Sequence, residues 1–155
     1  MTCLYLLCGT VGTGKTTYAR KLEEEGRAVL FSADEWMIHF FGTALPRDEF
    51  DRRLDQCKEM IYRTTEKLLN QGLSVVLDFG FWKRSERDSL RKRFARYEIR
   101  LLYFKLPEDE ILRRLAERNR NLPEYSYEIT EEMYRMFSAR FDPPSEAENP
   151  LIINR

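Results

Sequence analysis

The chain has 155 residues, 43% hydrophobic and 34% charged, which is typical of one globular domain and excludes a long disordered chain. Twenty-six basic residues balance 26 acidic ones, so the net charge does not indicate a polyanionic partner. No apolar run approaches the length of a transmembrane helix, and Leu4–Cys8 is too short for a signal-peptide core.

In the first half of the chain, short apolar runs alternate with helical patterns. Leu4–Cys8 predicts a strand, followed by a Gly-rich turn and a helix that ends at Gly26. Ala28–Ser32 predicts a second strand. Apolar residues then recur at helical spacing, which predicts a long amphipathic helix over about 48–70, ended by Gly72.

The same alternation continues in the second half. Ser74–Leu77 predicts a buried strand that ends at Asp78. Ser85 has the position of an N-cap, with an acidic residue three positions later, for a helix with Leu90 on its inner face. Ile99–Phe104 predicts the next strand.

The last third completes the pattern. Pro107 and three acidic residues after it predict the start of a helix, and Thr130 predicts the N-cap of the final helix. Leu151–Ile153 predicts a closing strand. Five strands with intervening helices predict an α/β fold, a three-layer doubly wound sandwich around a five-stranded parallel sheet, with residues 1–155 as one domain.

The irregular segments lie between these elements. They are Gly42–Arg47, Asn119–Tyr127 and Asp142–Pro150. Loops of this kind carry binding residues or move during function. We expect a lid near residues 114–128.

The turn after the first strand contains the most specific motif of the chain. Gly9–Thr16 fits the phosphate-loop pattern G-x-x-x-x-G-K-[ST] without departure, between a predicted strand and a predicted helix. Glycines allow successive N–H groups to point at a phosphate, and the helix N-terminus favours negative charge. A purely structural Gly-rich turn is the alternative.

The motif predicts ATP and Mg²⁺ as ligands. Lys15 is placed to reach the β- and γ-phosphates, and the Thr16 hydroxyl to ligate Mg²⁺. The predicted nucleotide-binding residues are Gly9, Thr10, Val11, Gly12, Thr13, Gly14, Lys15, Thr16 and Thr17. Because the chain contains no N-K-x-D motif and is short for a large ATPase module, these features favour a small kinase over a GTPase or motor ATPase.

Two carboxylates follow predicted strands and should meet at the edge where those strands end. Asp34 follows the second strand, where it could accept the proton of an attacking hydroxyl; the alternative is that Asp34 or Glu35 only starts a helix. Asp78 ends a strand of the Walker B type and could hold magnesium or a substrate hydroxyl; the alternative is a carboxylate bonded to nearby backbone. The aromatic segment 79–82 is either core or a stacking surface.

Two groups of basic residues are candidates for phosphate binding. Arg114 and Arg118 share a helix face and could close over the phosphates as a lid, or one of them could be merely exposed. The run from Lys83 to Arg100 contains eight basic residues against three acids. It is either a solvated helix face or a phosphate-rich or nucleic-acid surface.

Together, several motifs resemble a family of small P-loop kinases that includes the polynucleotide 5′-hydroxyl kinase module, chloramphenicol phosphotransferase and zeta-toxin-like kinases. The resemblance rests on Gly9–Thr16, Ser32-Ala33-Asp34, the strand ending at Asp78, Arg114-x-x-x-Arg118 and Phe141-Asp142-Pro143-Pro144. It implies Asp34 as general base, Lys15 and Arg118 as phosphate stabilisers, and the segment 141–144 beside the adenosine. At the place of an arginine that grips substrate phosphate in polynucleotide kinases, this chain has Met37.

We therefore expect a kinase that transfers the γ-phosphate of ATP to a hydroxyl of a small molecule or nucleoside-type acceptor, as a monomer or homodimer. The alternatives are a polynucleotide 5′-hydroxyl kinase and a nucleotide-dependent ATPase or switch without an acceptor. His39, the only histidine, is expected to be structural rather than catalytic. Three cysteines without metal-ligand spacing or even pairing fit a reducing cytoplasm, with no membrane partner.

Overall fold

The computed structural model describes residues 1–154. Its centre is a five-stranded sheet in the order β2-β3-β1-β4-β5, and every neighbouring pair of strands is parallel. The strands are β1 (Cys3–Cys8), β2 (Val29–Ser32), β3 (Val75–Gly80), β4 (Glu98–Phe104) and β5 (Leu151–Ile153). The predicted α/β fold with a five-stranded parallel sheet is confirmed.

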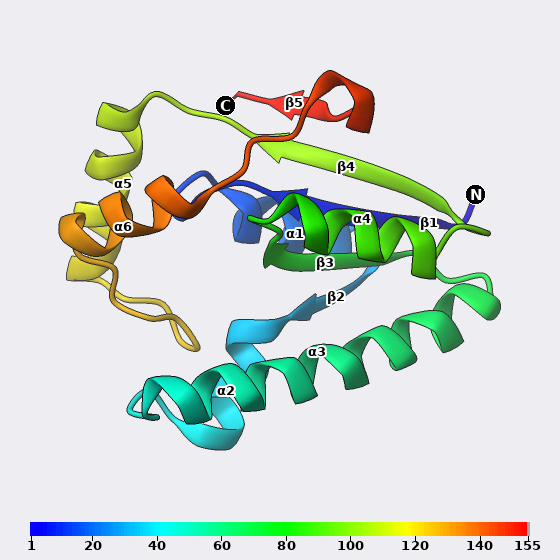
Figure 1. The fold of residues 1–155 in the computed structure, drawn as a ribbon, viewed down its shortest axis with the longest axis horizontal. Helices are drawn as coiled ribbons and strands as arrows, with labels where there is room; N and C mark the ends of the chain where they lie inside the picture. The colour runs from blue at the N-terminus through cyan, green and yellow to red at the C-terminus, as the bar shows by residue number, and fades with distance from the viewer. Residues whose placement is uncertain (155) are drawn as a thin grey trace.

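Helices cover both faces of this sheet, as Figure 1 shows. In chain order they are α1 (Lys15–Glu24), α2 (Ala33–Phe41), α3 (Arg47–Asn70), α4 (Arg84–Arg93), α5 (Glu108–Arg120) and α6 (Glu131–Arg140), with a 3₁₀ turn at Glu146–Glu148. The α3 and α4 helices pack on one face and α1 on the other, while α5 and α6 lie beyond the ends at which the strands finish.

The central strand β1 is buried along its whole length because both of its faces are covered. Leu4 and Leu6 point to the face under α3 and α4. Tyr5 and Leu7 point to the face under α1. This burial fixes the strand that leads directly into the Gly-rich turn.

Of the two helix N-caps predicted from sequence, one is confirmed and the other is wrong. Thr130 caps α6 as predicted, since its side-chain oxygen accepts the N–H of Met133 at 3.2 Å. The predicted N-cap at Ser85 is wrong: α4 begins at Arg84, and Ser85 lies in its first turn. The reason is a distant cap, because the Asp142 carboxylate accepts the backbone N–H of Arg84 at 3.3 Å.

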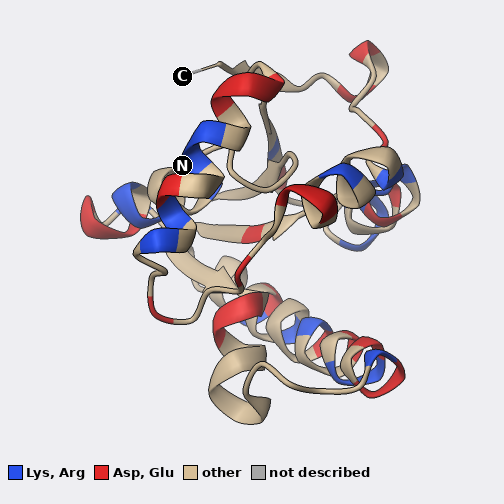
Figure 2. Ribbon diagram, turned by 90° about the vertical axis from the view of Figure 1, so that its left-hand side faces the viewer, with Lys and Arg blue, Asp and Glu red and all other residues tan. Residues whose placement is uncertain are grey.

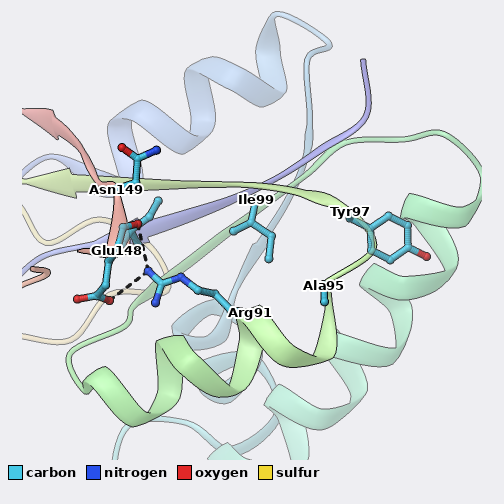
Figure 3. Close-up of a pocket in the computed structure, with 7 residues that line it drawn as sticks. Arg91, Ala95, Tyr97, Ile99, Glu148 and Asn149 are labelled. Carbon is cyan, nitrogen blue, oxygen red and sulfur yellow. Dashed lines mark hydrogen bonds and ion pairs between the residues drawn. The ribbon is translucent and has the colours of Figure 1, made fainter. Parts of the chain in front are cut away.

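A buried ion pair ties the C-terminal segment 142–149 to α4. Arg87 is completely buried and makes two parallel hydrogen bonds to the Glu148 carboxylate, at 2.8 and 3.2 Å. Its third contact is the Phe81 carbonyl, at 2.8 Å. Arg91 also donates to the Glu148 carboxylate, at 3.1 Å, beside a depression of about 300 Å³ that Figure 3 shows. We call segment 142–149 the strap.

The strap and α3 account for much of the basic run at 83–100. Besides the arginines that bind the strap, Arg93 pairs with Glu59 and Glu66 of α3, and Arg100 with Glu98. Arg87 therefore differs from both sequence interpretations of this run, since it is neither solvated nor open to a ligand. Basic and acidic residues are interspersed over the helices, as Figure 2 shows. In residues 1–154, no helix combines the length and apolar character needed to cross a membrane.

Candidate functional site

The Gly-rich turn closes against the end of β3 and the helix α5. The Gly9 N–H donates to the Gly80 carbonyl at 3.0 Å, which joins the turn to the neighbouring strand. Gly12 has a φ of +78°, and a Cβ there would lie 3.0 Å from the Leu115 side chain. A larger residue at position 12 would therefore be strained in its backbone and crowded by α5.

The N-terminus of α1 is open to an anion. Gly14 occupies its N-cap position in the left-handed conformation and provides no side-chain cap, and no acidic residue lies in the first turn. The unpaired N–H groups of this turn and the partial positive charge of the helix end remain available. This is the geometry that binds phosphate at a helix N-terminus.

The Lys15 side chain folds over this turn. Its Nζ donates to the Thr10 carbonyl at 2.6 Å and lies 3.5 Å from the Thr13 hydroxyl. Burial lowers the pKa of Lys15, while the nearby carboxylates of Asp78 and Asp34 act in the opposite direction. An arriving phosphate could take the place of these two protein oxygens as the partner of the ammonium group.

Thr16 and Asp78 form the pair that could hold Mg²⁺. The Thr16 hydroxyl donates to the Asp78 carboxylate at 2.7 Å, which joins the first turn of α1 to β3. Both side chains offer hard oxygen ligands, and Mg²⁺ commonly takes one or two protein oxygens beside phosphates and waters. The residues present therefore fit a magnesium ion that arrives with a nucleotide.

Asp34 lies in the first turn of α2, at the carboxyl end of β2. The cap of this helix is Ser32, whose hydroxyl accepts the Glu35 N–H at 3.2 Å, so capping does not occupy the Asp34 carboxylate. The side chain is exposed to water, yet surrounding atoms remove part of its hydration. This loss and the like charge of Asp78 raise the pKa of Asp34 to about 6, against the opposing effect of Arg118 and Lys15.

The two predicted lid arginines are placed differently. Arg118 is half-buried and donates to the Tyr127 carbonyl at 3.2 Å, and its charge acts on both Asp34 and Asp78. Arg114 is held by Glu110 at 2.9 Å, with a guanidinium nitrogen 3.6 Å from where a Cβ on Gly14 would be. Arg118 thus lies near the carboxylates of Asp34 and Asp78, whereas Arg114 lies over the Gly-rich turn.

Three further residues lie at or near the site without a role predicted for them individually from sequence. Lys58 of α3 is close enough to lower the pKa of Asp34. The Trp82 indole donates to the Gly9 carbonyl at 3.1 Å. The Tyr127 hydroxyl is buried without a hydrogen-bond partner in residues 1–154. Sequence marked the segments that contain Trp82 and Tyr127 but not these contacts, because each contact joins elements far apart in the chain.

The remaining candidates lie on or beside α2 and β3. Met37 is 1% exposed, so at this position the chain has a core residue. His39 is exposed, with its Nδ1 3.3 Å from the Tyr125 hydroxyl in the predicted lid. Phe81 is fully buried and stacks against Phe79, which favours the core interpretation of this aromatic segment.

Solved structures of low sequence identity share this fold. A candidate kinase from Chloroflexus aurantiacus superposes with a TM-score of 0.73 at 21% identity, over 99% of this chain and 88% of that one. A gluconokinase from Sinorhizobium meliloti 1021 gives 0.63 at 16% identity, over 97% and 81%. A chain of the Pnkp1/Rnl/Hen1 RNA repair complex gives 0.65 at 20% identity, over 93% of this chain and 49% of that one.

A family model covers most of the sequence. The model described as an AAA domain matches residues 4–144, which include the Gly-rich turn, Asp34, Asp78, Arg114 and Arg118. This match agrees with the P-loop kinase fold of the solved structures and with the resemblance seen in the sequence. The chain therefore belongs to the AAA domain family of P-loop proteins.

Proposed function

We propose that the chain is an ATP-dependent kinase that transfers the γ-phosphate to a hydroxyl of a small molecule or nucleoside-type acceptor. The observation that carries this proposal is the meeting of Lys15, Asp34, Asp78 and Arg118 at one edge of the sheet. A nucleotide-binding turn alone serves many reactions. A carboxylate with a raised pKa beside the phosphate site is what a hydroxyl acceptor requires.

The proposed reaction follows from these positions. Backbone N–H groups of the Gly-rich turn that follow Gly9, and the Lys15 ammonium, hold the triphosphate. The acceptor oxygen attacks the γ-phosphorus and gives its proton to Asp34, while the bond between that phosphorus and the β,γ-bridging oxygen breaks. The products are a phosphate monoester and ADP. Arg118 stabilises the negative charge of the transferring group.

Magnesium would be held by Thr16 and Asp78. When bound with the nucleotide, it would neutralise charge on the β- and γ-phosphates. We place the lid at residues 114–128, since Arg114 and Arg118 lie at its start and the Tyr125 hydroxyl contacts α2. Lid closure would exclude water from the transferring phosphate. The three buried free cysteines support a cytoplasmic location.

A polynucleotide 5′-hydroxyl kinase is the second candidate, because one structural match comes from an RNA repair complex. The pairing of Arg87, Arg91 and Arg93 with acids weighs against it, since these cations already have protein partners. A nucleotide-dependent ATPase or switch without an acceptor is the third. It requires no base for an acceptor hydroxyl, whereas Asp34 is free to act as one.

An acceptor screen separates the three candidates. ADP release would be measured with MgATP alone, with a panel of sugars, sugar acids and nucleosides, and with DNA and RNA bearing 5′-hydroxyl ends. The proposal predicts that one class of small acceptor raises ADP release at least tenfold and becomes phosphorylated. Labelling of oligonucleotide ends alone would favour the second candidate. Hydrolysis that no acceptor changes would favour the third.

A further inference from the structure

A depression of about 380 Å³ lies between α3 and α4, and none of the site residues above except Lys58 lines it. Figure 1 shows that these two helices diverge toward the ends at which the strands finish. The lining residues are Asp55, Lys58, Glu59 and Tyr62 of α3 and Lys83, Ser85, Glu86, Ser89 and Leu90 at or near α4. We propose that this depression, which we call the α3–α4 pocket, binds the acceptor, and that the acceptor is a small polyhydroxylated molecule; the inference rests on the proposed kinase function.

Lys58 connects the pocket to the general base. Its side chain is 18% exposed, and its Nζ donates to the Glu86 carboxylate at 3.1 Å and lies 5.7 Å from the centre of the Phe79 ring. The same charge acts on the Asp34 carboxyl. Phe79 directly follows Asp78 in β3. Lys58 thus lines the pocket and also lies within electrostatic reach of Asp34, the proposed base.

The free groups of the pocket suit hydroxyl ligands. Within residues 1–154, the side chains of Asp55, Lys83, Ser85 and Ser89 make no hydrogen bond or ion pair to the rest of the protein. A carboxylate accepts, an ammonium donates, and a serine hydroxyl does both, which matches a row of hydroxyls that each donate and accept. The ring of Tyr62 provides an apolar surface for the carbon skeleton.

Size and charge argue against a polymer. The volume is near the lower end for small-molecule sites, so a single sugar-sized ligand suits it. The lining carries Asp55, Glu59 and Glu86 against two lysines, so it offers no excess of positive charge for a chain of phosphates. Glu86 and Glu59 already bind Lys58 and Arg93, which leaves Asp55 as the available carboxylate.

The first experiment measures transfer to D-ribose, D-gluconate, D-glucosamine and glycerol, which present hydroxyls with neutral, acidic or basic character. Asp55→Asn removes the free carboxylate charge, and Ser89→Tyr fills the pocket. We expect the acceptor KM to rise about tenfold in Asp55→Asn and kcat/KM to fall roughly 100-fold in Ser89→Tyr, with the KM for ATP within about twofold. Asp51→Asn is the matched control, since Asp51 is exposed on α3 outside the pocket. It should leave all constants unchanged.

A second experiment does not need turnover. The native cysteines are all buried, so the thiol introduced by Ser89→Cys should be the one that reacts rapidly with an alkylating reagent. We expect at least one of the four probe compounds to slow this alkylation at least fivefold in the presence of a non-hydrolysable ATP analogue and Mg²⁺. The same probes should not slow alkylation of the thiol introduced by Asp51→Cys.

The outcomes separate the two proposals. Transfer to a polyol with unchanged kinetics in Asp55→Asn and Ser89→Tyr would overturn the pocket assignment and leave the kinase proposal standing. Protection of the Ser89→Cys thiol without any transfer would support the pocket and contradict the kinase. Neither transfer nor protection with any of the four probes would overturn the inference.

Discussion

The carboxyl edge of the sheet places two carboxylates, Asp34 and Asp78, beside two cations, Lys15 and Arg118. These neighbours act in opposite directions on the pKa of Asp34, the proposed general base. Lost hydration and the charge of Asp78 raise the pKa of Asp34, and the cations limit the rise to about 6. At neutral pH the carboxyl is therefore mostly ionised and still basic enough to take a proton.

This pKa predicts the acid limb of the pH–rate profile. A general base must be ionised, so kcat/KM for the acceptor should rise tenfold per pH unit below about pH 6 and become level above it. An ordinary aspartate would place this limb near pH 4. Steady-state rates from about pH 3 to about pH 8.5 in a constant-ionic-strength buffer measure the midpoint. A midpoint near 4 would contradict the assigned environment of Asp34.

The contribution of Asp34 to folding stability should decrease with rising pH, whereas the rate increases. The pKa of Asp34 is higher in the folded state than in an unfolded chain, so the folded state binds the proton more tightly. The contribution of this carboxyl to stability is therefore lost as the pH rises from about 4 to about 6. We expect Asp34→Asn to raise the thermal unfolding midpoint at pH 8 and to leave it nearly unchanged at pH 4. A lower midpoint at pH 8 would show that the carboxylate stabilises the fold.

The two lid arginines should have separable effects. Arg118 acts on Asp34 and Asp78, whereas Arg114 lies over Gly14 and is held by Glu110. We expect Arg118→Met to lower kcat by about 10²–10³ because a charge on the transferring group loses its partner. Arg114→Met should raise the KM for ATP about tenfold with a smaller effect on kcat. A large loss of kcat in Arg114→Met, with mainly a raised KM for ATP in Arg118→Met, would show that Arg114 is the residue that stabilises the transferring group.

Sequence predicts candidate site residues where their place follows from a motif or a strand end. Lys15 and Thr16 were predicted from the phosphate-loop pattern, and Asp34 and Asp78 from predicted strand ends. In the structure β3 continues to Gly80, and Asp78 pairs in register with Ser32 at the end of β2. Lys58 was not predictable as a neighbour of Asp34. Its approach depends on how α3 packs on the sheet, and helical periodicity shows only which face is apolar.

At the scale of elements, the strap 142–149 fixes the segment that follows β3. Arg87 binds the Phe81 carbonyl, the Asp142 N–H donates to the Trp82 carbonyl at 2.8 Å, and the Trp82 indole donates to Gly9. A chain of contacts thus runs from the C-terminal strap to Gly9, the first residue of the Gly-rich turn. Loosening the strap should weaken nucleotide binding as well as folding.

Removing one partner of the buried pair tests this chain of contacts. Arg87→Met leaves the Glu148 charge buried without its main partner, and we expect a loss of about 3–5 kcal/mol in unfolding free energy. The double variant Arg87→Met/Glu148→Leu removes both charges and should recover much of that loss. Chemical denaturation of the three proteins measures the coupling. Additive losses would show that the two side chains do not depend on each other.

Acid should loosen the strap selectively. Burial alone would raise the pKa of Glu148, but hydrogen bonds from Arg87, the Ser145 N–H and Arg91 outweigh it and hold the pKa at about 2. Because the folded pKa lies below the unfolded value, this stabilisation is present above about pH 4.3 and is lost as the pH falls toward 2. We expect Glu148→Gln to be less stable than the native chain at pH 7, with the difference decreasing below pH 4. A difference that is constant with pH would contradict this assignment.

Element boundaries show why some local predictions succeed. Leu151–Ile153 is a strand with the predicted bounds, because a short apolar run follows a proline. The N-cap predicted at Ser85 is wrong because the group that caps α4, Asp142, lies 58 residues further along the chain. Local capping patterns cannot contain such a partner, and neither could they show that Arg87 is fully buried.

For the whole molecule, the alternation of strands and helices was sufficient to predict the parallel sheet but not its order. The order β2-β3-β1-β4-β5 brings the ends of β1, β2 and β3 together, and it depends on which faces α1, α3 and α4 cover. The family match extends over nearly the same residues as this sheet and its helices. The catalysis proposed for this edge depends most on Asp34.

The most direct test compares the native chain with Asp34→Asn in phosphate transfer from γ-labelled ATP to the acceptor found by the screen. We expect transfer to fall at least 10²-fold, because the attacking hydroxyl loses its base, while MgATP binds within about threefold of the native affinity. Calorimetric titration with a non-hydrolysable analogue measures that affinity. Full transfer by Asp34→Asn would show that Asp34 is not the general base.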